Sequence, residues 1–416
     1  MNSKKSRVFL TGKPLAYLLA LVYFTSYMTR KNFATVLQQV VTDTGLAKDT
    51  LSVILVAMTV TYGVGQIVSG RLSDKFKPAN MILYGLGLAT VINLLFPLLP
   101  FSVPLMAILW GINGFAHALV WPPMIKILVA NCDDAMYGYS VVRVYWGCSI
   151  ATILLYLVAP LTISAGAGWK GIFFVSSAMG IGMILLWVVL KRRIFEGTSE
   201  KPVSTVEPVK TKKKGAMLPR AAVLPFLLIA MGVILHGMLR DGVATWMPTY
   251  LAENHGMSNE VSIFSGVFPA IFSIVCFTVG GALYGKVFKN EVVCATAIFG
   301  LATASALILF LLYGKSNATV ATVCLTAITG CMHGVNLMLV THIPKRFKKS
   351  GNVSTMAGIV NACTYVGEAI FTYGFSMLAT HFSWRICLFA CLAIAALGMF
   401  CCLFATRPWK KFIEQE

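Results

Sequence analysis

Long apolar segments recur along almost the whole chain and constrain its fold more than any other feature. A helix needs about 20 apolar residues to cross the hydrocarbon core of a bilayer, and backbone in lipid must satisfy its own hydrogen bonds. Charged residues make up only 12% of the 416, about half the fraction of a soluble domain. We therefore predict an all-α membrane protein with twelve transmembrane helices. The spans are expected at about residues 15–41, 50–72, 79–99, 103–128, 137–163, 170–191, 221–251, 260–285, 291–313, 319–342, 354–380 and 384–405.

Positive charge is distributed unevenly between the two sides of this predicted topology. The net charge of +19 would by itself suggest a nucleic-acid partner. Most of the 34 Lys and Arg residues, however, fall in the termini and loops of one side. The other side carries only Lys48, Lys170, Lys315 and Arg385. This is the positive-inside pattern, so we expect both termini in the cytoplasm, a cell membrane as the location and no nucleic-acid partner.

A polar segment divides the spans into two sets of six. We predict an N-terminal six-helix bundle at 1–190, a cytoplasmic linker at 191–220 and a C-terminal six-helix bundle at 221–416. Short motifs recur in the same order in both halves, which makes the bundles pseudo-symmetric. The pairs are Arg30 with Arg240, Gly70-Arg71-Leu72 with Gly281-Ala282-Leu283, Gly114-Phe115-Ala116-His117 with Gly330-Cys331-Met332-His333, Tyr145-Trp146-Gly147 with Tyr365-Val366-Gly367, and Trp169-Lys170 with Trp384-Arg385.

Two arginines lie inside apolar segments, at matched points of the halves. Leaving a guanidinium in hydrocarbon costs at least about 2.5 to 3.5 kcal/mol, so Arg30 and Arg240 must face protein, water or an anion. A guanidinium fork gives a phosphate two parallel, charge-assisted hydrogen bonds. We interpret the pair as two sides of one anion-binding site. The alternative is a structural ion pair of either arginine with Asp241 or Glu368.

Three further charged residues lie within or beside the spans. Glu368 is predicted either to couple protons or to serve as the counter-ion of Arg143 or of an empty-site arginine. Asp241 follows Arg240 directly and is turned about 100° from it on an α-helix. We therefore expect Asp241 to face another helix and not the ligand of Arg240. Arg143 either lines the site as a third cation or extends to the cytoplasmic surface.

Several motifs give the chain a family resemblance. The loop expected after the second span, Gly70-x-Leu72-Ser73-Asp74-Lys75-x-Lys77, resembles a cytoplasmic motif of the major facilitator superfamily, whose plan is two parallel six-helix repeats. More specific motifs lie in spans 1, 2, 4 and 7: Tyr27-x-x-Arg30-Lys31-Asn32-Phe33, Tyr62-Gly63-x-x-Gln66-x-x-Ser69-Gly70, Trp121-Pro122-Pro123 and Trp246-x-Pro248-Thr249-Tyr250-Leu251. Together they resemble the organophosphate:phosphate antiporters, which carry glycerol 3-phosphate and hexose phosphates.

This resemblance implies a set of site residues. The family's phosphate-binding arginines fall on Arg30 and Arg240. Its site aromatics fall on Tyr27, Tyr62, Trp121 and Tyr365, and a tyrosine position of span 10 is His333 here. Two family residues differ: a lysine of span 2 is Gln66 and a histidine of span 5 is Gly147. Gly70, Asp74 and Lys75 are expected to form a gating or packing element and not a ligand site.

These features predict a secondary transporter that moves a small organic anion by rocking of the two halves. The expected substrate is a phosphorylated sugar or polyol, exchanged for inorganic phosphate. One alternative is a proton-coupled carboxylate carrier with Glu368 as the proton site, and another is a transporter-like sensor of a sugar phosphate. The sequence has no phosphate-cradling Gly-Lys-Ser/Thr loop, nucleophile elbow or metal-ligand spacing. We therefore expect neither an ATP-driven pump nor an enzyme, no cofactor or metal, and a monomer.

Overall fold

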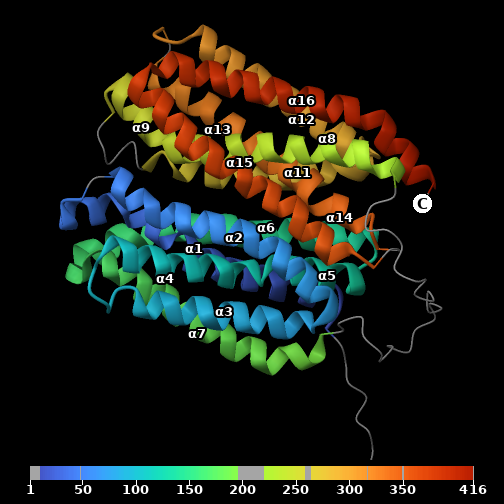
Figure 1. Ribbon diagram of the computed structural model, residues 1–416, viewed down its shortest axis with the longest axis horizontal. Coiled ribbons are helices and arrows are strands. Elements are labelled where there is room, and N and C mark those ends of the chain that lie inside the picture. The colour runs from blue at the N-terminus through green and yellow to red at the C-terminus, as the bar shows by residue number, and fades with distance from the viewer. Residues whose placement is uncertain are drawn as a thin grey trace, which may run out of the picture.

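The computed structural model describes residues 10–46, 48–194, 220–257, 264–315, 317–348 and 351–415, and within them no strand is formed. Most of the linker predicted at 191–220 lies outside these residues. Figure 1 shows two groups of long helices lying side by side, with the N-terminal half below and the C-terminal half above. The helices of both groups run in nearly the same direction, as expected for two bundles that cross one bilayer.

The N-terminal half contains seven α-helices and three short helical turns among the described residues. They are α1 (Gly12–Thr44), α2 (Lys48–Lys75), α3 (Pro78–Leu95), α4 (Val103–Ala118), α5 (Trp121–Asn131), α6 (Asp134–Thr162), η1 (Ile163–Ala167), η2 (Gly168–Lys170), α7 (Gly171–Leu190) and η3 (Lys191–Arg193). The prolines after Trp121 begin α5, because a proline lacks the N–H that an interior helix position needs. The predicted fourth span is therefore bent between α4 and α5.

The C-terminal half repeats this plan with two wide π-turns. Its elements are α8 (Arg220–Gly237), η4 (Met238–Gly242), α9 (Val243–His255), α11 (Val267–Lys286), α12 (Glu291–Leu311), α13 (Ala318–Val335), η5 (Asn336–His342), α14 (Ile343–Lys345), α15 (Val353–His381) and α16 (Trp384–Gln415). The π-turns η4 and η5 interrupt the seventh and tenth spans. Such turns occur frequently at functional sites.

The twelve predicted spans are confirmed. Nine helical stretches among the described residues are long and apolar enough to cross a membrane. One of them, at Asp134–Arg193, holds two predicted spans, which meet where Gly166 and Gly168 adopt positive φ angles of 82° and 58°. The first and eleventh spans are α1 and α15, which carry the charged candidates Arg30 and Glu368.

Buried asparagines fix α1 against its neighbours and so orient Arg30. The carbonyl of Thr29 accepts hydrogen bonds from Asn93 Nδ2 at 2.8 Å and from Asn113 Nδ2 at 3.0 Å. Asn32 Nδ2 donates to Asn93 Oδ1 at 2.7 Å. These side chains are fully buried, and an unpaired buried amide is costly, so the network determines the rotation of α1.

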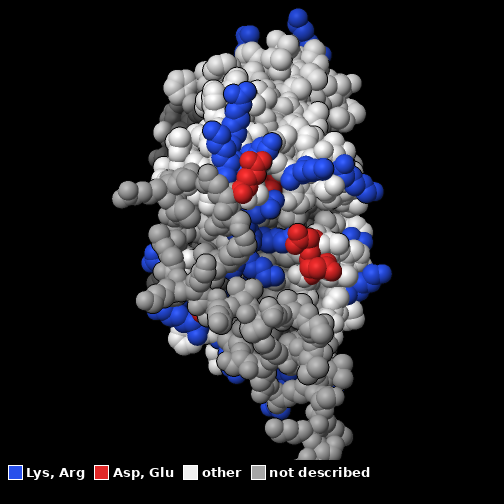
Figure 2. All heavy atoms as spheres, turned by 90° about the vertical axis from the view of Figure 1, so that its right-hand side faces the viewer, with Lys and Arg blue, Asp and Glu red and all other residues white. Residues whose placement is uncertain are grey.

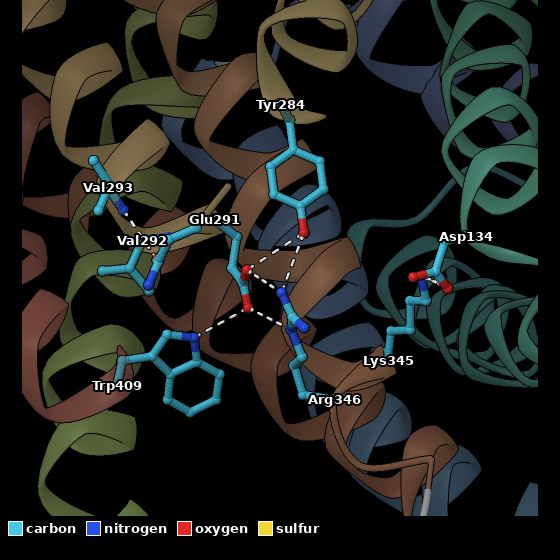
Figure 3. Close-up of polar contacts among 9 residues, drawn as sticks. Asp134, Tyr284, Glu291, Val292, Val293, Lys345, Arg346 and Trp409 are labelled. Carbon is cyan, nitrogen blue, oxygen red and sulfur yellow. Dashed lines mark hydrogen bonds and ion pairs between the residues drawn. The ribbon is translucent and has the colours of Figure 1, made fainter. Parts of the chain in front are cut away.

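The two halves are joined at the end of the molecule that lies at the right of Figure 1. Several Lys and Arg side chains gather on the visible part of this end, with a few Asp and Glu among them (Figure 2). Lys345 forms an ion pair with Asp134 of the other half at 2.6 Å (Figure 3), and Tyr137 donates to the Thr341 carbonyl at 2.7 Å. The same end of the C-terminal half is held by a buried cluster in which Glu291 binds Arg346, Tyr284 and Trp409 (Figure 3).

Gly70, Asp74 and Lys75 lie in the last turns of α2, so their prediction as a loop is wrong. Gly70 and Asp74 pack against the start of α15 in the other half, where Ser73 bonds to Ser354 and Thr355 donates to Asp74. A Cβ atom at Gly70 would lie 2.8 Å from the Ser354 carbonyl oxygen, so only glycine permits this approach. Lys75 does not belong to this contact and is exposed.

Candidate functional site

A cavity lies between the two halves and contains about 1090 Å³ of space not filled by atoms, including solvent at its mouth. Its wall extends along α1 from Tyr23 to Thr35 and along α6 from Tyr145 to Tyr156. Both helices start at the basic end, so the cavity runs from their middle toward the opposite end. The C-terminal half supplies residues of η4, α9, α11, α13, η5 and α15.

Arg240 lies in the cavity wall and is held by protein acceptors on two sides. Its Nε and one terminal nitrogen donate to Asp241 Oδ2, and its other terminal nitrogen donates to Asn336 Oδ1 at 2.8 Å. These contacts occupy three of the five N–H groups of a guanidinium. The other two have no acceptor among the described residues and can meet an anion in the cavity.

Asp241 also lies in the cavity wall beside Arg240, so the prediction that it does not face the ligand of Arg240 is wrong. It pairs with Arg240 and lies 3.8 Å from Lys31 Nζ on α1 of the opposite half. The expected 100° separation from Arg240 assumed an α-helix. In the π-turn η4 the hydrogen bonds span five residues, so neighbouring side chains lie closer in angle. Arg240 therefore forms the structural ion pair with Asp241 that was the alternative to an anion site, and it still lines the cavity.

Arg30 lies behind the cavity wall in a cage of tyrosine rings. Its guanidinium carbon is 4.4 Å from the ring centre of Tyr27, 4.7 Å from Tyr62 and 5.9 Å from Tyr365. Tyr27 and Tyr365 belong to the wall and therefore separate Arg30 from the cavity. Arg30 Nε is buried without a partner, and no carboxylate among the described residues pairs with this arginine.

The aromatic candidates take two different positions. Trp121, Tyr27 and Tyr365 line the cavity, whereas Tyr62 is buried behind it, 4.4 Å from the ring of Tyr365. Tyr62 therefore supports Arg30 and Tyr365 and does not face the cavity. His333 lines the cavity beside Phe277, with ring centres 5.2 Å apart.

Two polar residues of the site were missed by sequence reasoning. Asn336 holds Arg240 and donates to the Tyr145 hydroxyl at 2.7 Å, and this hydroxyl also bonds to Thr341 at 2.7 Å. Arg240 is thereby connected to α6 of the opposite half. Tyr145 was visible only as the repeat partner of Tyr365, and Asn336 as a polar residue within an apolar span.

Two charged candidates lie outside the cavity wall. Glu368 is partly buried on α15, and its Oε2 has no partner. Arg143 stacks on Tyr139 and Trp146 of its own helix, with its guanidinium carbon 3.8 and 4.6 Å from their ring centres. Arg143 therefore does not supply a third cation to the cavity.

The departures from the family pattern have local explanations in packing. A Cβ atom at Gly147 would lie 2.4 Å from the Ala20 carbonyl oxygen, so a histidine cannot occupy this position while α1 and α6 pack so closely. Gln66 is fully buried beside α15 and does not line the cavity. In the described part of the chain, no group of three His, Cys, Asp or Glu could hold a metal ion.

Curated relatives are similar over much of the chain. The "Glycerol-3-phosphate transporter" of Bacillus subtilis (strain 168) is 25% identical over 87% of this chain and 85% of that protein. A "Probable hexose phosphate transport protein" of Chlamydia muridarum is 30% identical over 45% of this chain and 40% of its own length. The "Membrane sensor protein UhpC" of Salmonella typhimurium is 26% identical over 56% of this chain and 55% of that protein. These relatives confirm the resemblance to the organophosphate:phosphate antiporters.

The fold and the family agree with this similarity. The crystal structure of the transporter FucP in the outward conformation superposes with a TM-score of 0.69 at 14% identity, covering 94% of this chain and 98% of that one. The two-bundle membrane fold is therefore confirmed, and the matched proteins are not enzymes, as predicted. The profile described as "Major Facilitator Superfamily" matches residues 19–372. This multi-pass membrane chain belongs to the Major Facilitator Superfamily.

Proposed function

We propose that the chain carries a small phosphorylated sugar or polyol across a cell membrane in exchange for inorganic phosphate. The observation that carries this proposal is the cationic cavity between the halves. Arg240 and Lys31 line it from opposite sides, and Arg30 lies directly behind Tyr27 and Tyr365. A cavity shared by both halves and lined by a guanidinium with free N–H groups suits a multivalent anion.

The charges of the site favour a dianion over a monoanion. Arg30, Lys31 and Arg240 lie in or behind the wall, and among the described residues Asp241 is the carboxylate that forms close ion pairs with two of them. Glu368 is near enough to interact with all three, and positive charge at the site still exceeds negative charge. A phosphate ester carries nearly two negative charges at neutral pH. Polar side chains farther along the wall suit the hydroxyl groups of a sugar or polyol; they include Ser149, Thr152, Ser273, Thr329 and Asn361.

Exchange of one anion for another, without movement of the empty carrier, is expected from the free-energy cost of desolvating these cations. We place the basic end in the cytoplasm by the positive-inside rule, so the halves are closed on the cytoplasmic side and the cavity faces outward. Rocking to the opposite state must enclose the site. Enclosing an empty site would desolvate uncompensated cations, whereas a bound dianion would offset their charge. The carrier should therefore cross between states readily only when an anion is bound.

Uptake into proteoliposomes tests this proposal. Vesicles loaded with inorganic phosphate should take up radiolabelled glycerol 3-phosphate or glucose 6-phosphate faster than empty vesicles. Arg240→Lys should slow this uptake, because a point charge replaces the two-pronged donor. Arg385→Lys, at the opposite end of the molecule from the basic surface, is the matched control and should transport normally. Equal uptake rates in phosphate-loaded and empty vesicles would overturn the exchange mechanism.

Glu368 supports a second candidate, a proton-coupled carrier. Its Oε2 is buried without a partner in the helix that also supplies Tyr365, and an intramembrane carboxyl is a typical proton-relay group. In this case uptake should follow an imposed pH gradient without internal phosphate, and Glu368→Gln should abolish that uptake but leave exchange intact.

The similarity to a membrane sensor supports a third candidate, a receptor that binds a sugar phosphate without moving it. Binding without flux in the same vesicles would favour this function. Saturable binding can be followed by thermal shift of the purified protein, so the two outcomes are distinguishable. Flux of any phosphate ester above that of protein-free vesicles would exclude a pure sensor.

A further inference from the structure

Arg143 places a permanent positive charge on the lipid-facing surface of α6. Helix periodicity puts Tyr139, Arg143, Trp146, Ile150, Leu157 and Leu161 on one face. The last three are 48%, 50% and 67% exposed. Because the chain crosses a membrane, these exposed apolar side chains contact lipid. Arg143 lies on the same stripe, nearer the basic end, and not on the face that lines the cavity.

The chain leaves this guanidinium without a charged partner of its own. Its guanidinium carbon lies over two aromatic rings, 3.8 Å from the ring centre of Tyr139 and 4.6 Å from that of Trp146. Its Nε is buried and unpaired, and none of the described carboxylates forms an ion pair with it. An arginine in the apolar part of a bilayer costs at least about 2.5 to 3.5 kcal/mol unless an anion or water meets it.

A second cation and a second phenol reach the same place from α1. Lys13 Nζ lies 5.9 Å from the ring centre of Tyr139, and the Tyr17 hydroxyl is 2.9 Å from the Tyr139 hydroxyl. Lys13 and Tyr17 are exposed, and Leu21, one turn further along α1, is also exposed. The surface where α1 and α6 meet therefore carries two cations and two hydroxyl groups beside exposed apolar side chains.

The positions of Arg143 and Lys13 along their helices suit the phosphate level of a lipid leaflet. Arg143 follows the first residue of α6 by nine positions, or about 14 Å along the axis. Long side chains on a helix point toward its N-terminus, which here is the basic end. Lys13 is the second residue of α1 at that same end. The pair thus spans the boundary between headgroups and acyl chains.

We propose that an anionic phospholipid binds on this surface of α1 and α6, with its phosphate at Arg143 and Lys13 and its acyl chains along Ile150 and Leu21. Basic pockets between membrane helices on the cytoplasmic side are suited to such headgroups. The site adjoins the seam between the halves, because Trp146 Nε1 donates to Thr278 Oγ1 of α11 at 3.1 Å. A bound lipid would therefore contact the surface along which the halves move.

Lipid binding to the purified protein tests this inference. The full chain in detergent is mixed with equal amounts of phosphatidylglycerol and phosphatidylcholine, and bound lipid is counted by native mass spectrometry. We expect preferential binding of phosphatidylglycerol. Arg143→Gln and Lys13→Gln should each weaken it about fivefold, the effect of one basic residue near an anionic lipid. Lys411→Gln, an exposed change at the end of α16, is the matched control and should have no effect.

Two further measurements keep the result interpretable. In the absence of lipid each variant should unfold within a few degrees of the unchanged protein, because only contacts with aromatic rings are lost and no ion pair among the described residues. Addition of inorganic phosphate should not displace phosphatidylglycerol, since a free ion has no acyl chains to contact the exposed apolar side chains. Displacement by phosphate, or unchanged lipid preference in Arg143→Gln, would overturn the proposal. None of these readouts depends on transport, so they stand or fall separately from the proposed exchange.

Discussion

Arg30 and Arg240 lie at matched points of the two halves, and their surroundings differ. Arg240 is paired with the carboxylate of Asp241 and the amide of Asn336, inside a wide turn. Arg30 is surrounded by the rings of Tyr27, Tyr62 and Tyr365, on a regular helix fixed by buried asparagines. Arg240 thus has a carboxylate partner, whereas the neighbours of Arg30 are tyrosine side chains and no carboxylate among the described residues pairs with it.

We propose that this difference gives the two arginines different tasks in anion binding. A substrate that reaches Arg240 must share it with Asp241, so part of the binding energy is offset by the contact it replaces. Ring faces stabilise Arg30 by only about 0.5 to 2 kcal/mol each, well below a full ion pair in a dry site. Arg30 should therefore gain more than Arg240 from binding an anion. Movement of Tyr27 or Tyr365 would expose the Arg30 guanidinium to the cavity.

The largest expected effect comes from Arg30→Lys. A lysine keeps the charge but cannot form two parallel hydrogen bonds, nor can it lie flat between rings. Loss of two charge-assisted hydrogen bonds should reduce phosphate exchange about a hundredfold. Exchange is measured in phosphate-loaded proteoliposomes. If Arg30→Lys exchanges as fast as the unchanged protein, the caged arginine is structural and the comparison with Arg240 fails.

Asp241→Asn should act in the opposite direction and on the other arginine. The amide can still accept hydrogen bonds from Arg240, so packing is preserved, but it no longer competes as an anion. Phosphate binding should become about tenfold tighter, the equivalent of one hydrogen bond to a charged group. Isothermal titration of the purified protein measures this change. Weaker binding in Asp241→Asn would mean that the carboxylate organises Arg240 and does not compete with substrate.

The sequence predicted this fold and the central pair because each rests on a local signal. An apolar run of helix-spanning length identifies a span wherever it lies, and a charge within such a run at matched repeat positions identifies Arg30 and Arg240. The direction of the Asp241 side chain relative to Arg240 was predicted wrongly, because nothing in the sequence marks η4 as a π-turn. The roles of Asn336 and Tyr145 depend on contact between residues 191 positions apart, which a single sequence does not reveal.

The orientation of Arg143 shows a second limit of sequence reasoning in a membrane protein. In a soluble helix, polarity separates the buried face from the solvent face. In α6 both faces are apolar, because one packs against protein and the other against lipid, so periodicity could not distinguish them. Only the exposure of Ile150, Leu157 and Leu161 on the same stripe indicates which face Arg143 shares.

The aromatic cage around Arg30 can be tested with two changes at Tyr365. Tyr365→Phe keeps the ring face and should change exchange little, whereas Tyr365→Leu removes it. We expect Tyr365→Leu to slow exchange about fivefold, in line with one cation–π contact. Rates in phosphate-loaded proteoliposomes distinguish the two variants. Equal rates in Tyr365→Phe and Tyr365→Leu would show that the ring does not hold Arg30, and a larger loss in Tyr365→Phe would assign the role to the hydroxyl group.

The smallest expected effect comes from Lys31→Gln, which removes the second partner of Asp241. The Lys31 and Asp241 groups are 3.8 Å apart, with 32% and 17% of their side chains exposed, so their attraction is partly screened. Loss of such a pair is worth less than about 1 kcal/mol, and we expect exchange to slow about two- to threefold. Lys170→Gln, an exposed change outside the cavity, is the control. A loss as large as that of Arg30→Lys would mean that Lys31, and not the caged arginine, is the main anion contact of the N-terminal half. The difference between the two arginines would then have to be traced to their neighbours on α1 and η4.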